Sequence, residues 1–164
     1  MNKKFIVTAI TATALTATGL SVAIADGHKK KGPFHNEIEA RQALMQMYKF
    51  NIGILGAMAK GKMDYNAEKA TRAAGNLKMA AAIDQSDMWP KGSDLTNKEV
   101  TTKTTAKMEA WTTMPKVVDA HKVFADASAK LADAAGSGLD GLRGAIGGVG
   151  KSCKGCHDDF RQKP

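Results

Sequence analysis

A Cys-x-x-Cys-His motif, Cys153-Lys154-Gly155-Cys156-His157, stands close to the C-terminus. Two thiols at this spacing can add to the two vinyl groups of one porphyrin, and the adjacent imidazole can then bind the iron from one face. Cys153 and Cys156 are the only cysteines in the sequence, so no disulfide competes for them. The motif therefore predicts one haem c, attached covalently through Cys153 and Cys156, with His157 as an axial iron ligand.

Two other chemistries use a similar motif. A zinc site built from two cysteines and one histidine needs a fourth ligand, and the remaining histidines, His28, His35 and His121, show no paired spacing. A redox-active Cys-x-x-Cys stands at the start of a helix that follows a strand, whereas this motif lies near the end of an expected helix in a chain without strand patterns. Covalent haem is the interpretation that we favour.

The N-terminus has the pattern of an export signal. Lys3 and Lys4 precede an apolar, threonine-rich run over residues 5–24, and Ala23-Ile24-Ala25 is typical of a signal peptidase site. A membrane anchor fits less well, because the threonines and a glycine dilute the run. We predict a secretory signal peptide over residues 1–25, cleaved after Ala25, and a periplasmic protein without a membrane anchor.

The net charge of +8 is modest and scattered, except at Lys29-Lys30-Lys31. We interpret residues 26–35 as a flexible, solvated basic leader. No aromatic residues alternate with these lysines, so the charge does not indicate a nucleic-acid partner.

The remaining residues predict helices throughout. Apolar residues recur at steps of three and four over residues 36–60 and 66–83, with Gly61 ending the first helix and Asn66 capping the second. A third helix begins between Ala106 and Pro115, and a fourth begins at Ser137 and carries the haem motif. We expect an all-α fold, an antiparallel up-and-down four-helix bundle, in which residues 85–105 form an irregular connection that wraps the cofactor edge.

The inner faces of these helices can be predicted from the same spacing. We expect the first helix to bury a stripe of seven residues and the third helix a stripe that includes Val118 and His121. The complete first stripe is Ile38, Arg41, Met45, Tyr48, Ile52, Leu55 and Ala59. We interpret Met47 and Met58 as packing residues, and His121 as a hydrogen-bonded histidine rather than a second ligand.

The ending Gly-Lys-Ser-Cys-Lys-Gly-Cys-His-Asp-Asp-Phe-Arg and the pair Arg41-Gln42 on the first helix carry a family resemblance. The sequence resembles the class II c-type cytochromes, which comprise cytochrome c′ and its low-spin relatives. The resemblance implies that residues 36–164 form one four-helix cytochrome domain. It also implies that Arg41 approaches a haem propionate, that Gln42 contacts the cofactor, and that Thr105 is a polar haem contact.

Met45, four residues after Arg41, matches the family position that faces the distal side of the iron. A methionine there coordinates iron in the low-spin relatives, and a thioether is a ligand that suits haem iron. The flanking Leu44-Met45 and the segment 55–61 resemble the low-spin branch more than cytochrome c′. We therefore expect Met45 to be the second metal ligand beside His157.

These expectations describe a periplasmic one-electron carrier with low-spin, His/Met-ligated iron, which is not an enzyme. Its partners would be redox proteins of the periplasm, and a homodimer is compatible with the alanine-rich second helix. The alternative is a five-coordinate haem protein of the cytochrome c′ type, which binds nitric oxide or carbon monoxide while Met45 only gates access to the iron.

Overall fold

The computed structural model describes residues 31–163, and four long helices account for most of them. The elements in chain order are α1 (His35–Ala59), α2 (Ala67–Ala81), the 3₁₀ turn η1 (Ser86–Met88), the short α3 (Glu109–Thr112), α4 (Met114–Ala134) and α5 (Leu139–Phe160). The all-α fold and the four-helix bundle are confirmed. The predicted signal peptide, and the basic leader as far as residue 30, lie outside the described residues.

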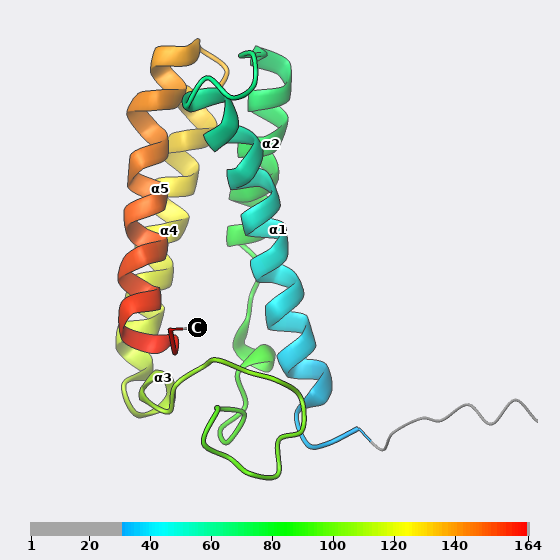
Figure 1. Ribbon diagram of the computed structural model, residues 1–164. Helices are drawn as coiled ribbons and strands as arrows, with labels where there is room; N and C mark the ends of the chain where they lie inside the picture. Colours follow the sequence, from blue (N-terminus) through cyan, green and yellow to red (C-terminus); the bar gives the residue numbers. More distant parts are fainter. Residues whose placement is uncertain (1–30, 164) are drawn as a thin grey trace, which may run out of the picture.

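The four long helices form a closed ring of neighbours, in which α1 packs on α2, α2 on α4, α4 on α5, and α5 on α1. The contact between α1 and α5 is the sparsest of the four, and the two helices diverge toward one end of the bundle (Figure 1). Residues 85–105 cross this end as an irregular segment, which we call the strap (Figure 1). The haem motif on α5 and the first turns of α1 lie at the same end.

The predicted helix boundaries are largely correct because their capping residues act locally. The Asn66 side chain accepts a hydrogen bond from the Lys69 N–H at 2.8 Å, as an N-cap should. Gly61 follows α1 at a φ of 68°, which suits a residue without a Cβ atom. The predicted start of the fourth helix at Ser137 is two residues early, because α5 begins at Leu139 and Gly138 is its N-cap, with a φ of 120°.

The core lies between the facing stripes of the four helices. On α1 the most buried line is shifted by one residue from the predicted stripe at several points, so that Leu44 lies inside and Met45 is only partly buried. Met58 is 1% exposed and packs in the core, as predicted. Met47 is 51% exposed, so its interpretation as a packing residue is wrong. It lies on the outer side of α1, where no other helix of the bundle covers it.

The start of α4 extends beyond the bundle core. His121, on α4, pairs with Gln85, which lies four residues after the end of α2. The residues of α4 that precede His121 therefore lie past the end of α2. Val118 is consequently 60% exposed, and its predicted burial is wrong. Phe124, Ser128 and Leu131 form the buried side of α4 instead. No helix within residues 31–163 is long and apolar enough to cross a membrane.

Candidate haem site

The two cysteines lie on α5, partly buried and not joined in a disulfide. Cys153 packs against the apolar cluster that forms the bundle core, and Cys156 lines a groove between α4 and α5 together with Ala127 and Gly148. Burial raises the pKa of both thiols, and the neighbouring Cys153 and Asp159 also raise that of Cys156. The thiols are therefore protonated at neutral pH, and both are accommodated by largely apolar surroundings, which suits attachment of a flat apolar group.

His157 follows the cysteines on the same helix and is partly buried. Burial lowers the pKa of its imidazole, and the charge of Arg161 lowers it further. The Arg161 Nη1 atom lies 3.4 Å from the His157 Nδ1 atom. The neutral imidazole is the form that binds a metal, so this environment fits the expected axial ligand.

The last turn of α5 is tied to the segment that precedes α3. Ala106 and Arg161 form an isolated antiparallel bridge, and the Lys107 N–H donates to the Phe160 carbonyl at 2.9 Å. The Thr105 carbonyl accepts from the Gln162 N–H at 2.8 Å, so Thr105 lies beside the end of the haem-bearing helix. The bridge thus brings one predicted haem contact to within a turn of His157.

Arg41 is the most buried charged side chain on α1, with 3% of its surface exposed. Its guanidinium donates to the Ser93 hydroxyl at 2.7 Å, to the Thr104 hydroxyl at 3.0 Å, and to the carbonyls of Ser93 and Met88 in the strap. Burial lowers its pKa to about 10, an effect that Asp94 and Glu37 partly offset, so the group stays charged at neutral pH.

None of the described residues supplies Arg41 with a carboxylate at ion-pair distance. Removing a charge from water without an opposite charge is costly, and buried charges are normally paired. A buried guanidinium that lacks a carboxylate at ion-pair distance, at the haem-bearing end of the bundle, fits the expectation that a haem propionate approaches it. Four of its five N–H groups are already used by strap oxygens, so only Nε–H is free of these bonds.

The other two predicted residues of α1 differ in their surroundings. The Gln42 side chain is exposed and donates to the Lys103 carbonyl at 2.7 Å, so it holds the strap rather than pointing into the core. Met45 is one turn further along α1 than Arg41 and packs against the apolar cluster that Cys153 also contacts. The structure therefore brings Met45 and Cys153 to the same cluster, from helices more than a hundred residues apart in the chain.

A polar chain beside this cluster was not foreseen from the sequence. The Gln85 amide nitrogen lies 2.9 Å from the His121 Nε2 atom and 3.3 Å from the Tyr48 hydroxyl. That hydroxyl donates to the Ala80 carbonyl at 3.1 Å, and burial raises the pKa of Tyr48 to about 12. His121 is hydrogen-bonded, as predicted. The position of Gln85 was not predictable, because it lies in an irregular turn without periodicity.

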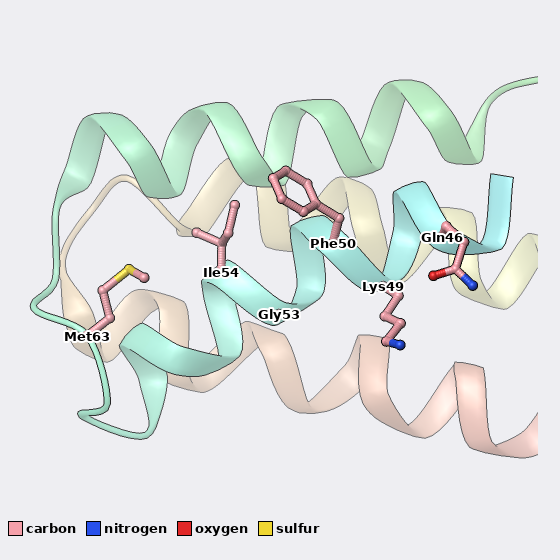
Figure 2. Close-up of a pocket in the computed structure, with 6 residues that line it drawn as sticks. All are labelled: Gln46, Lys49, Phe50, Gly53, Ile54 and Met63. Atoms are coloured by element: carbon pink, nitrogen blue, oxygen red, sulfur yellow. The ribbon is translucent and has the colours of Figure 1, made fainter. Parts of the chain in front are cut away.

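A separate hollow lies on the outer surface of α1, lined by Phe50, Ile54 and Met63 with Gln46, Lys49 and Gly53. Figure 2 shows Phe50 and Ile54 projecting from α1 on the side nearer to α2, with Met63 contributed by the turn after α1. None of the residues expected to contact haem lines this hollow. The candidate haem site is therefore the region between α5, the first half of α1 and the strap.

The fold and site define a class of protein: a helical bundle that holds one covalently attached haem c near the end of its last helix. A family model described as Cytochrome C′ matches residues 36–161, so the chain belongs to the cytochrome c′ family. Cytochrome c′ of Cereibacter sphaeroides is 37% identical over 126 residues, covering 77% of this chain and 83% of that protein.

Two further relatives agree with this assignment. Cytochrome c-554 of the same organism is 35% identical over 126 residues, covering 77% of this chain and 80% of that one. A solved structure, cytochrome c′ from Rhodobacter Spheriodes, is 36% identical with a TM-score of 0.76, covering 80% of this chain and 98% of that one. One haem c is thus the cofactor of this chain.

The expected function needs correction. The family model, the solved structure and the cytochromes c′ of Cereibacter sphaeroides, Halomonas halodenitrificans and Allochromatium vinosum are all named cytochrome c′, which corresponds to the alternative interpretation of the sequence. The prediction of an electron carrier with low-spin, His/Met-ligated iron is wrong, and the comparisons point to cytochrome c′ rather than to the low-spin branch. A methionine on a partly buried stripe is an ordinary packing residue, because its flexible thioether fills irregular gaps in a core, so its identity alone does not make it a ligand.

Proposed function

We propose that this protein is a five-coordinate haem c protein that binds nitric oxide or carbon monoxide, with His157 as the single protein ligand of the iron. The haem supplies an open iron coordination position, and the chain controls access to that position. The proposal is supported by membership of the cytochrome c′ family. A solved relative, 27% identical with a TM-score of 0.68, is a nitric oxide complex of a mutant cytochrome c prime from Alcaligenes xylosoxidans.

The observation that carries the proposal is the packing of Met45. This side chain is partly buried and lies against the apolar cluster, so its thioether already has close neighbours. A side chain held by packing excludes water and small ligands from the space it occupies, but it yields when a ligand binds. We propose that Met45 gates the distal side of the iron without bonding to it.

The other expected site residues have separate roles in this proposal. Arg41 pairs with a haem propionate, which supplies the negative charge that the buried guanidinium lacks. Gln42 and Thr105 help to hold the strap and the last turn of α5 beside the cofactor edge. The chemistry is binding rather than turnover, so we do not expect an enzymatic activity.

Carbon monoxide binds ferrous iron, so the haem must receive an electron from a donor before it can bind this ligand. We propose export to the periplasm with cleavage of the signal peptide after Ala25, and reduction by a periplasmic redox partner. N-terminal sequencing of protein purified from the periplasmic fraction checks the cleavage position, and Asp26 is the residue expected at the mature N-terminus.

The visible spectrum of purified protein tests the function. We expect a high-spin ferric spectrum, and a ferrous spectrum that changes on addition of carbon monoxide or nitric oxide. A low-spin ferric spectrum with a weak far-red sulfur band, together with a ferrous spectrum that carbon monoxide leaves unchanged, contradicts the proposal. Haem staining after denaturing electrophoresis confirms in the same preparation that the cofactor is attached.

We also propose that the protein forms a homodimer through α1 and α2. The hydrogen bond from Tyr48 to the Ala80 carbonyl aligns the middle of α1 with the last turn of α2. Four large apolar side chains are exposed at this level: Met47, Phe50, Met79 and Ile83. Large apolar side chains exposed at one level of two neighbouring helices are typical of an interface between subunits.

A further inference from the structure

The guanidinium of Arg41 lies over two neighbouring indole rings, which form a corner on one side of it. Its Cζ atom is 4.8 Å from the ring centroid of Trp89, in the strap, and 5.6 Å from that of Trp111, in α3. The two rings are 5.8 Å apart at an interplanar angle of 52°, and the Trp111 Nε1–H donates to the Trp89 carbonyl at 3.0 Å. Three segments of the chain, α1, the strap and α3, therefore meet at one cation.

The strap is held to α1 mainly at this point. Arg41 supplies four hydrogen bonds to it, and Gln42 and His35 add one each, to the Lys103 carbonyl and to the Thr102 hydroxyl. The strap itself contains no long helix that could hold its shape. Its geometry therefore depends on where the Arg41 side chain is placed.

Aromatic rings are suited to placing a buried guanidinium. A ring face attracts a cation while leaving its N–H groups free in the guanidinium plane, where they can donate to several acceptors at once. The four strap oxygens that accept hydrogen bonds from Arg41 are neutral, so these hydrogen bonds alone do not neutralise the buried charge. The two indoles fix the cation without using any of its donors.

We propose that Trp89 and Trp111 are positioning residues that clamp Arg41, so that the shape of the strap and the positive charge beside the haem are controlled by one contact. The clamp of the strap follows from the described contacts alone. The effect on the haem rests on the proposed pairing of Arg41 with a propionate. If Arg41 does not pair with a propionate, the cleavage of the strap still depends on the clamp. The two parts of the proposal can therefore fail separately.

Trypsin sensitivity of the haem-loaded protein tests the clamp. Lys91, Lys98 and Lys103 are exposed sites within the strap. We expect Trp111→Leu and Arg41→Lys to increase the cleavage rate at these lysines about tenfold, since loss of a desolvated cation–ring contact changes an opening equilibrium by that order. Trp111→Phe keeps a ring face and should restore most of the protection. Val118→Ala, a truncation of an apolar side chain that is 60% exposed on α4, is the control.

Intrinsic fluorescence gives a second measurement, because Trp89 and Trp111 are the only tryptophans in the chain. Haem quenches nearby indoles, so we expect stronger emission from Arg41→Lys than from the unmodified protein. Trp89→Phe and Trp111→Phe assign the signal to each ring, and they serve as milder substitutions if Trp111→Leu does not fold.

The haem midpoint potential completes the test. If the clamp places the charge, Trp111→Leu and Arg41→Lys shift the potential in the same direction, and Trp111→Phe shifts it less. Unchanged cleavage of the strap in Trp111→Leu and Trp111→Phe would overturn the clamp. If cleavage increases but the midpoint potential is unchanged, the result supports the clamp of the strap and overturns its effect on the haem.

Discussion

The ammonium group of Lys107 donates to the backbone carbonyl of Asp159 at 2.9 Å, and also to that of Asp158 at 3.1 Å. Both carbonyls belong to the last turn of α5, where the helix has unpaired acceptors and the negative end of its dipole. The segment before α3 thus caps the helix that carries the haem motif. This contact links the geometry of His157 to a residue fifty positions earlier in the chain.

Removing this cap should loosen the end of α5. We expect Lys107→Met to lower the free energy of unfolding of the haem-loaded protein by about 1 kcal/mol, because two charge-assisted hydrogen bonds are lost at a partly solvated site. Urea denaturation followed by circular dichroism measures this change. Lys103→Met removes an exposed lysine from the same region and should have an effect below about 0.5 kcal/mol. Equal effects of the two substitutions would argue against a cap.

Truncation of Met45 should open the distal side of the iron. In Met45→Ala we expect a ferric spectrum that stays high-spin and an association rate for carbon monoxide that rises about tenfold, equivalent to a barrier lower by about 1.4 kcal/mol. Flash photolysis measures this rate. Met47→Ala is the matched control, because that side chain is 51% exposed on the outer side of α1. A change from a low-spin to a high-spin spectrum in Met45→Ala would show that Met45 is a ligand after all.

The buried hydroxyl of Tyr48 should make stability depend on alkaline pH. Burial raises its pKa from 10.0 to about 12, so between these values the unfolded chain releases a proton that the folded protein retains. The contribution of Tyr48 to stability is therefore complete below pH 10 and falls as the pH rises toward 12, by up to about 2 to 3 kcal/mol. Tyr48→Phe should flatten this part of the profile. An unchanged alkaline fall in the variant would assign it to other groups.

His121 should have the opposite effect, at acid pH. Burial lowers its pKa below the ordinary value of 6.5, so the unfolded chain takes up a proton before the folded protein does. The contribution of His121 to stability is complete above pH 6.5 and is lost as the pH falls toward its lowered pKa. Comparing urea midpoints of the unmodified protein and His121→Gln between pH 7 and pH 5 isolates this contribution. We expect a shallower acid loss in the variant, and parallel curves would contradict the prediction.

Self-association should depend on the exposed apolar surface of α1 and α2. Phe50 is 65% exposed, and a lysine in its place would bring a strongly hydrated charge into the proposed interface. We expect Phe50→Lys to raise the dimer dissociation constant at least about tenfold, measured by sedimentation equilibrium. Val118→Lys, at a valine that is 60% exposed on α4, is the control and should leave the constant unchanged. Similar weakening by both substitutions would place the interface elsewhere.

The haem motif and the helices could be predicted because their signals are local. Cys153, Cys156 and His157 define the cofactor chemistry by spacing alone, and Asn66 and Gly61 mark helix ends through bonds and dihedral angles within a few residues. Helical periodicity placed Arg41 on the inner face of α1, where it is buried. These features depend only on positions three or four residues apart, and a single sequence contains that information.

Only the tertiary structure decided which distant residues meet. Trp89 and Trp111 both contact Arg41, and Gln85 joins Tyr48 to His121, although each set comes from separate helices and irregular segments. No periodic pattern links such residues, because their proximity results from how the helices pack and how the strap folds back over their ends. The presence and covalent attachment of the haem were therefore contained in the sequence, whereas its polar surroundings were determined by packing.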